Sequence, residues 1–185
     1  MQSGIQKGRS GLCRKAQISH HFQKWLPEYE TEFSTKAISP FHLVKSKEPC
    51  WKCGVISEVI TFAAEGTVED GEENIGFVIF SYVSLVPKKL AGFVEENFKN
   101  YFIDYSNTTK SFYYINHCHR CSASLGDFYM HSEPEGAFFP MTVDEAKDIE
   151  LIELKGSGYI QLNADLTYQC PSTIEEHARR LKYRP

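Results

Sequence analysis

Four of the six cysteines form two Cys-x-x-Cys pairs, Cys50 with Cys53 and Cys118 with Cys121. A Cys-x-x-Cys turn supplies two thiolates from one tight loop, and two such turns complete the tetrahedron that zinc prefers. Four thiolates leave no open position for a reactive water molecule, so the zinc ion would stabilise the fold and not hydrolyse a substrate. The sequence therefore predicts one closed, structural Zn²⁺ site with these four ligands.

Other roles for these residues are less consistent with the pattern. A thioredoxin-type redox pair opens a helix, whereas the segment after Cys53, Val55 to Ile60, favours a strand. His117 and His119 flank the second pair, and either ring could replace a thiolate. Ring nitrogens at such positions more often support the ligands or face solvent, so we retain the four cysteines as the predicted ligands.

Cys13 and Cys170 have no partner at a useful spacing, and we interpret them as a tail thiol and a buried small hydrophobic residue. The first 25 residues contain no apolar run of signal-peptide type, and the longest apolar stretch, Phe77 to Val86, is too short to span a bilayer. We therefore expect a cytoplasmic protein, in whose reducing environment paired cysteines bind metal.

Both cysteine pairs adjoin predicted strands. The strings Cys50-Trp51-Lys52-Cys53-Gly54 and Cys118-His119-Arg120-Cys121 resemble the two knuckles of a zinc ribbon, which implies two β-hairpins pinned together by one zinc ion. Segments 114–118, 126–129 and 137–140 are also similar to uncharacterised bacterial proteins that carry such a ribbon. Two departures are Ser122, where a second glycine is common, and the 64 residues between Cys53 and Cys118.

The rest of the chain predicts a mixture of strands and helices. Strands are expected at 37–45, 55–62, 77–86, 111–116, 127–131 and 137–139, and as a hairpin of 151–154 with 159–162. Helices are expected within 14–26, from Pro87 to Tyr101, after the capping pair Thr142/Glu145, and after the capping pair Ser172/Glu175. Residues 1–13 are expected to form a flexible tail, and 14–185 a single α+β domain with a mixed or antiparallel sheet and zinc knuckles at 50–54 and 118–122.

Charge is distributed unevenly along the 185 residues. Residues 1–25 carry five basic residues and residues 177–185 carry four, in both cases without an acid. The body, 26–176, therefore carries 11 basic residues against 24 acidic ones, a net charge of −13 in a chain of net charge −4. Such a body repels a phosphate backbone and would attract a basic partner, or its charge serves solubility alone. An exposed loop over 65–76 would present its densest acids, Glu69, Asp70, Glu72 and Glu73.

Catalytic interpretations have weaker support. His131-Ser132-Glu133 and Pro49 to Cys53 contain both fragments of the zinc deaminase signature, but in reversed chain order and with the second cysteine pair left over. Asn116-His117 beside a cysteine pair is similar to HNH nucleases, without the second histidine. Asp127 and Glu135 could join His131 and Glu133 in an acid/base cluster, or all four could form a solvated rim.

The sequence thus favours a non-enzymatic protein-binding domain whose acidic segment contacts a basic protein. A small acidic chain without a catalytic motif has the properties of a bacterial inhibitor or immunity protein that neutralises a basic toxin. The alternative is a nucleic-acid-binding zinc ribbon, favoured by Trp51, Lys52 and Arg120 on the knuckles and opposed by the charge of the body. A metal-dependent hydrolase or nuclease is the third hypothesis.

Overall fold

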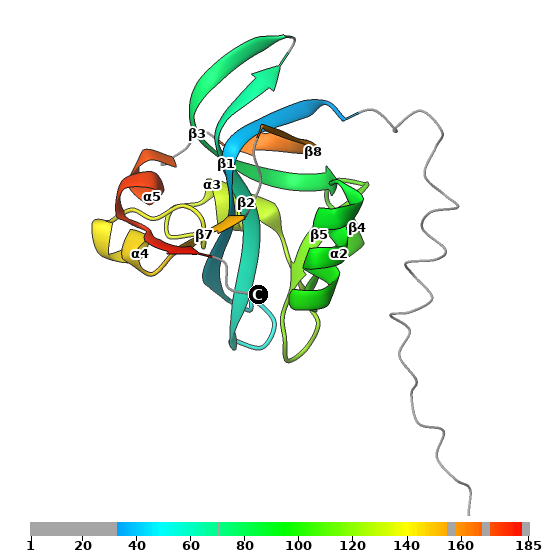
Figure 1. Ribbon diagram of the computed structural model, residues 1–185. Coiled ribbons are helices and arrows are strands. Elements are labelled where there is room, and N and C mark those ends of the chain that lie inside the picture. The colour runs from blue at the N-terminus through cyan, green and yellow to red at the C-terminus, as the bar shows by residue number, and fades with distance from the viewer. Residues whose placement is uncertain (1–32, 70, 155–157, 168–170, 183–185) are drawn as a thin grey trace, which may run out of the picture. The chain divides into compact units, whose positions relative to one another are not determined.

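Segments rich in β-branched and aromatic residues form most of the fold, as their composition favours. The computed structural model describes residues 33–69, 71–154, 158–167 and 171–182, all of which belong to one unit of the chain, Phe33–Pro185 (Figure 1). The tail predicted over 1–13, the helix predicted within 14–26, Cys13 and Cys170 lie outside the described residues. The elements are β1 (Thr35–Pro49), β2 (Ile56–Glu69), β3 (Glu72–Leu85), α2 (Lys88–Asn97), β4 (Tyr101–Ser106), β5 (Ser111–His117), β6 (Ser124–Leu125), α3 (Asp127–Ser132), α4 (Val143–Lys147), β7 (Glu150–Leu154), β8 (Tyr159–Thr167), α5 (Pro171–His177) and β9 (Arg179–Lys182).

Strands β1, β2, β3 and β8 close into a small barrel, because β2 pairs with β1 and β3 while β8 pairs with β3 and β1, all antiparallel (Figure 1). β7 adds to β1, and β9 adds in parallel to β7. Strands β4, β5 and β6 form a second antiparallel sheet. The described residues are therefore mostly antiparallel β-structure with four short helices, which agrees loosely with the expected α+β class.

The apolar run of β3 is buried on both faces, as its sequence predicted. Along Phe77–Phe80 the side chains alternate between two core clusters: Phe77 and Ile79 join the cluster that contains Cys50 and Cys118, while Val78 and Phe80 join the one that contains Phe41 and Phe62. This period of two is the geometry of a strand. The core around the barrel therefore continues directly into the cysteine pairs.

The predicted hairpin of 151–154 with 159–162 is wrong, although both segments are strands. β7 pairs with β1 from Phe41 to Lys45, and β8 pairs with β1 from Thr35 to Ile38, so the two strands follow one another along the same edge of β1. The change of partner coincides with the cis Ser39-Pro40 bond, where the register of β1 against β2 also shifts. Proline lacks the N–H group that a continuous ladder requires.

The acidic loop predicted over 65–76 is instead the end of the β2–β3 hairpin, at the top of Figure 1. The two strands stay paired from Gly66↔Ile75 to Glu69↔Glu72. Residues 71–76 are all exposed, and of the residues paired with them only Gly66 and Thr67 are buried, so the sequence here lacks the apolar alternation that marks a strand.

Helix predictions were partly confirmed. α2 follows Pro87 as expected but ends at Asn97, so that Tyr101 begins β4. Thr142 and Glu145 form the predicted capping box of α4. α5 begins at Pro171, so Ser172 lies inside the helix that it was expected to cap. Across the described ranges, no helix combines the length and apolar character that a membrane crossing requires.

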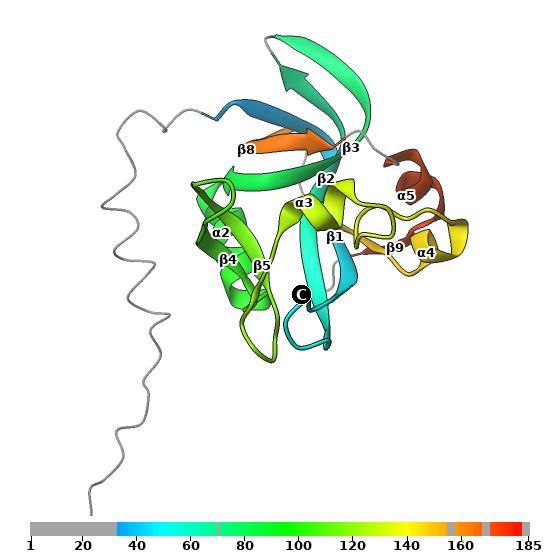
Figure 2. The ribbon, with the colours of Figure 1, turned by 180° about the vertical axis from the view of Figure 1, so that it is seen from behind.

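Two short predicted strands are not strands. Residues 127–131 form α3, and residues 137–139 form a turn in which the Phe139 amide donates to the Gly136 carbonyl oxygen at 2.8 Å. The Phe138 amide donates to the carbonyl oxygen of Met130 at 2.9 Å and fastens this turn to α3. α3 and the turn lie across the back of the barrel (Figure 2).

Candidate metal centre

The first cysteine pair occupies the turn between β1 and β2. The Cys50 amide donates to the Val55 carbonyl oxygen at 2.9 Å, and the Gly54 amide donates to the Cys50 carbonyl oxygen at 2.8 Å. Gly54 has a φ of 71°, a conformation that glycine adopts without a steric penalty. The backbone therefore folds into a knuckle that directs both thiols to one side.

The second pair repeats this geometry between β5 and β6. The Cys118 amide donates to the Ala123 carbonyl oxygen at 2.9 Å, and the Ser122 amide donates to the Cys118 carbonyl oxygen at 2.9 Å. Ser122 has a φ of 56° and so adopts the conformation that Gly54 adopts in the first knuckle. The serine that departs from the expected glycine is thus accommodated with a backbone penalty of about 1 kcal/mol.

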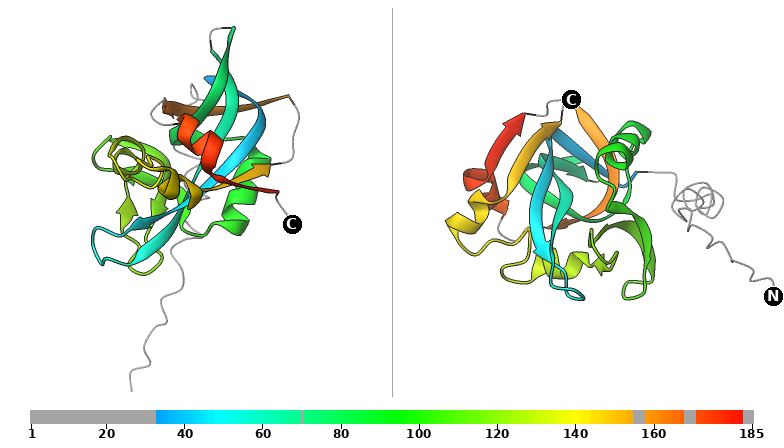
Figure 3. Two further views of the ribbon diagram at one scale, coloured as in Figure 1. Left: turned by 90° about the vertical axis from the view of Figure 1, so that its left-hand side faces the viewer. Right: turned by 90° about the horizontal axis from the view of Figure 1, so that it is seen from below.

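The two knuckles bring all four predicted ligands together. The loops after β1 and β5 that carry them both lie at the lower edge of Figure 1, the end that faces the viewer in the right-hand view of Figure 3. The Sγ atoms of Cys50 and Cys121 are 3.6 Å apart, as are those of Cys53 and Cys118, and all four lie within 4.8 Å of one another. A tetrahedral ion with bonds of about 2.3 Å requires sulfurs about 3.8 Å apart. The four thiols are free and positioned to hold one metal ion.

The electrostatics of the cluster favour a bound cation. Burial acts to raise the pKa of the Cys118 thiol, but hydrogen bonds from the Cys121 and Arg120 amides and the Ser57 hydroxyl lower it to about 5. The Val55 amide acts to lower the pKa of the Cys53 thiol, whereas burial and hydrogen bonds with the other three cysteines raise it to about 12. Four thiolates this close repel one another, so they ionise together only around a cation.

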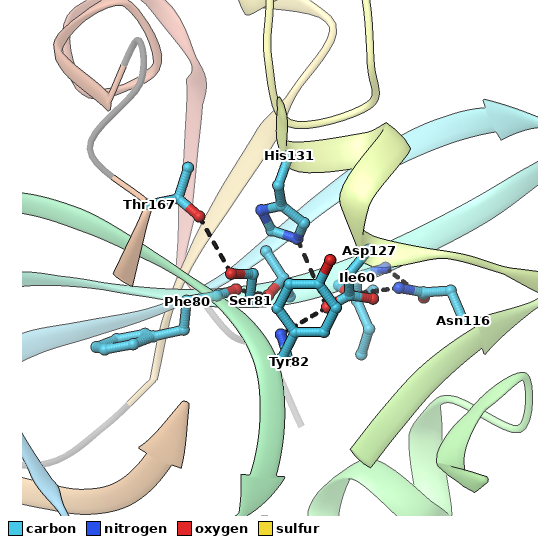
Figure 4. A network of polar contacts seen from close by, with 9 residues as sticks. Ile60, Phe80, Ser81, Tyr82, Asn116, Asp127, His131 and Thr167 are labelled. Carbon is cyan, nitrogen blue, oxygen red and sulfur yellow. Dashed lines mark hydrogen bonds and ion pairs between the residues drawn. The ribbon is translucent and has the colours of Figure 1, made fainter. Parts of the chain in front are cut away.

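Three side chains fix one knuckle against the other. The side-chain amide of Asn116 accepts a hydrogen bond from the Ile60 N–H through Oδ1 and donates one to the Ile60 carbonyl oxygen through Nδ2, both at 2.9 Å (Figure 4). It thereby acts as a strand partner for β2 two residues before Cys118. The Ser57 hydroxyl accepts from the His119 amide at 3.3 Å, and Trp51 Nε1 donates to the carbonyl oxygen of Ser124 at 2.9 Å.

Both histidines beside the second knuckle lie outside the ligand set. His117 stacks on Phe102 with ring centroids 4.0 Å apart, and its Nε2 lies 3.1 Å from an Asp104 carboxylate oxygen. His119 Nδ1 lies 3.2 Å from the Ser57 hydroxyl. Both rings therefore have partners outside the cysteine cluster.

The predicted acid/base cluster is brought together only in part. Asp127 and His131 are buried side by side in α3, whereas Glu133 is half-buried and Glu135 is exposed. No histidine joins the cysteines in the only metal-ligand cluster found among the described residues, which argues against the deaminase interpretation. Of the predicted partner-binding acids, Glu72 and Glu73 are exposed and Glu69 is half-buried, while Asp70 lies outside the described residues.

Sequence reasoning missed the roles of Ser57 and Asn116. Both are buried polar residues in strands next to a cysteine pair. A polar residue at a buried strand position is the only available signal, and the pairing partner cannot be read from it.

No family model matches this chain, and the comparisons with curated proteins and with solved structures found no matching protein. The function must therefore be argued from the site and the surface.

Proposed function

We propose that the cysteine cluster binds a structural zinc ion and that the barrel is a non-enzymatic protein-binding domain, whose β2–β3 hairpin contacts a basic protein. The zinc assignment rests on the four-thiolate donor set, which suits Zn²⁺ and fills its coordination sphere. The antiparallel strands on either side of each knuckle support the resemblance to a zinc ribbon. Such a site fixes a scaffold and leaves recognition to the surface.

The observation that carries the binding proposal is the hairpin arm, which we define as residues 66–69 and 71–76. Glu72 and Glu73 are exposed on it, and Ile75 is 77% exposed, the highest value among the large hydrophobic side chains described. From Cys53 to Pro87 the sequence contains six acids and no lysine or arginine. Exposed acids around an apolar side chain complement a cationic surface that carries a small hydrophobic patch.

An inhibitor or immunity protein that masks a basic toxin would use such a surface. Complementary charge accelerates association and weakens steeply with salt, because exposed charges are screened over about 8 Å at physiological ionic strength. We therefore expect binding to a basic protein that weakens as salt is raised.

The test is a pair of charge-matched double variants. Glu72→Lys/Glu73→Lys reverses the arm, and Glu95→Lys/Glu96→Lys reverses two exposed acids of α2 with the same change in net charge. With a synthetic lysine- and arginine-rich peptide containing one leucine as the probe, we expect the arm variant to lose at least tenfold in affinity and the α2 variant to stay within about threefold of wild type. Equal losses of affinity in the two variants would mean that net charge alone determines binding. Unchanged binding by the arm variant would refute the role of the arm.

A second candidate is nucleic-acid binding at the knuckles, and one observation favours it. Trp51 is 75% exposed, its ring is oriented by the hydrogen bond to Ser124, and Lys52 and Arg120 are exposed nearby. Base stacking on an exposed aromatic ring stabilises single-strand complexes. Titration at low salt with a single-stranded oligonucleotide, comparing wild type with Trp51→Ala, tests it; the same weak binding in both would eliminate this candidate.

A further inference from the structure

Two ionisable side chains of α3 are buried in the core and belong to neither proposed function. Asp127 and His131 are 4% and 2% exposed, and they lie one helical turn apart. The distance from Asp127 Oδ2 to His131 Nε2 is 4.0 Å. Figure 4 shows the two side chains pointing toward one another above β3.

Apart from the ends of the six-residue helix α3, which has Asp127 in its first turn and His131 in its last, few described groups are placed to stabilise charge on either residue. Asp127 Oδ2 accepts a hydrogen bond from the Tyr82 amide at 2.7 Å. Asp127 Oδ1 and His131 Nδ1 are buried, and neither has a hydrogen-bond partner among the described residues. Throughout the described ranges, neither lysine nor arginine forms an ion pair with Asp127. An isolated buried carboxylate is costly, so such a group tends to become neutral.

Among the described residues, the elements packed against the pair supply no lysine or arginine that interacts with Asp127. Tyr82 of β3, Tyr101 of β4, Tyr113 of β5 and Asp165 of β8 are the titratable groups that interact with Asp127. The ring of Phe138 covers His131, with centroids 4.8 Å apart. Asp165 repels a charge on Asp127, and the phenols and the phenyl ring are neutral. In the part of the chain that the structure describes, His131 is the one ionisable side chain paired with Asp127 that could carry a positive charge.

We propose that Asp127 and His131 form a neutral pair that holds a single proton on the carboxyl group, and that this pair fastens α3 to β3. At 4.0 Å, Asp127 Oδ2 and His131 Nε2 are too far apart for a direct hydrogen bond. An ion pair would therefore place two charges in a buried site without the hydrogen bond that offsets their desolvation. The neutral pair avoids both charges. The carboxyl still accepts from the Tyr82 amide, whose residue has an unusual φ of 50° that this contact helps to hold.

The acid strengths of the two groups support this arrangement. Burial raises the pKa of Asp127 to about 7, opposed by the Tyr82 amide and reinforced by the charge of Asp165. Burial lowers the pKa of His131 to about 3. Between these values the folded pair carries one proton, and that proton resides on Asp127.

With this arrangement, the contribution of the pair to the free energy of unfolding does not change with pH in mild acid. In the unfolded chain a carboxyl titrates near pH 4 and an imidazole near pH 6.5, so between about pH 4 and 6.5 the unfolded pair also carries one proton, on His131. Alone, the raised pKa of Asp127 would make stability fall as pH rises through this window. Alone, the lowered pKa of His131 would make stability rise. The two contributions cancel, because folding moves a proton from the imidazole to the carboxyl without net uptake.

Nuclear magnetic resonance of the full-length protein at pH 5 locates the proton directly. We expect the ¹⁵N shifts of His131 to report a neutral ring and the ¹³C shift of the Asp127 carboxyl to report a protonated acid. The same chain unfolded in urea at pH 5 is the control, in which an imidazole titrating near pH 6.5 should be largely protonated. An imidazolium signal for His131 with an ionised Asp127 would overturn the proposal.

Two variants give an independent readout. Relative to wild type, the folding equilibrium constant of Asp127→Asn should rise roughly tenfold per pH unit between pH 4 and 6.5, and that of His131→Leu should fall by a similar factor per pH unit. Profiles parallel to wild type in both variants would refute the cancellation. If a variant does not fold, the resonance experiment on the wild-type chain still decides the question.

Discussion

Replacing Asn116 with alanine should destabilise the fold by about 2–6 kcal/mol. The Asn116 side chain makes two hydrogen bonds of 2.9 Å to the backbone of Ile60, one to the N–H and one to the carbonyl group. Asn116 is 3% exposed and Ile60 is 2% exposed, so water cannot replace the lost partner. Each buried backbone group left without a partner costs about 1–3 kcal/mol, and the substitution leaves two.

Urea unfolding of the zinc-loaded proteins measures this loss as a change in midpoint at constant slope. The control is Asn97→Ala, which removes one hydrogen bond between an exposed amide and the Phe93 carbonyl oxygen and should cost less than about 1 kcal/mol. Because Asn116 precedes Cys118 by two residues, Asn116→Ala should also lose zinc to a competing chelator more readily than the control. An Asn116→Ala variant within about 1 kcal/mol of wild type would refute the claim that this side chain joins β5 to β2.

Two further substitutions test the local geometry. Ser122→Gly should stabilise the protein by about 0.5–1 kcal/mol in thermal unfolding, because Ser122 has a φ of 56° that glycine adopts freely. Gly54→Ala should destabilise it by a similar amount. A destabilising effect of Ser122→Gly would contradict the equivalence of the two knuckles. Gly136→Ala should cost more than about 2 kcal/mol, because its Cβ would lie closer than 3.0 Å to three backbone carbonyl oxygens between Tyr129 and Glu133. Gly126→Ala, whose Cβ meets nothing within 4 Å, is its control, and equal stability of these two variants would refute the packing argument.

The cysteine cluster could be predicted because each pair of metal ligands can be recognised from four consecutive residues. Two Cys-x-x-Cys turns define the ligand set whatever the fold between them, and here 64 residues, which include β2, β3, α2, β4 and β5, separate the pairs. The long strands could be predicted for a similar reason, since the run from Phe77 to Phe80 has to be buried on both faces.

Strand pairing depends on contacts distant in the sequence and could not be predicted. Residues 151–154 and 159–162 have strand character, but nothing in either segment reveals that both pair with β1 and not with each other. α3 was missed because five residues of mixed aromatic and polar character are too few to establish a period. Its buried positions, Asp127, Met130 and His131, do follow helical spacing.

The surroundings of Asp127 show most clearly which contacts could not be predicted from the sequence. Tyr82 and Asp127 are 45 positions apart, and their hydrogen bond depends on β3 and α3 meeting at the back of the barrel. Sequence reasoning left open whether Asp127 and His131 belong to an acid/base cluster or to a solvated rim. The structure buries both, and the turn after α3 brings Phe138 over the histidine ring.

X-ray absorption at the metal edge, combined with metal analysis of protein purified without chelators, tests the central claim most directly. We predict one zinc per chain with four sulfur neighbours at about 2.3 Å, supplied by Cys50, Cys53, Cys118 and Cys121. A nitrogen or oxygen neighbour in the first coordination shell, or a protein that takes up no zinc while its four thiols are reduced, would contradict it.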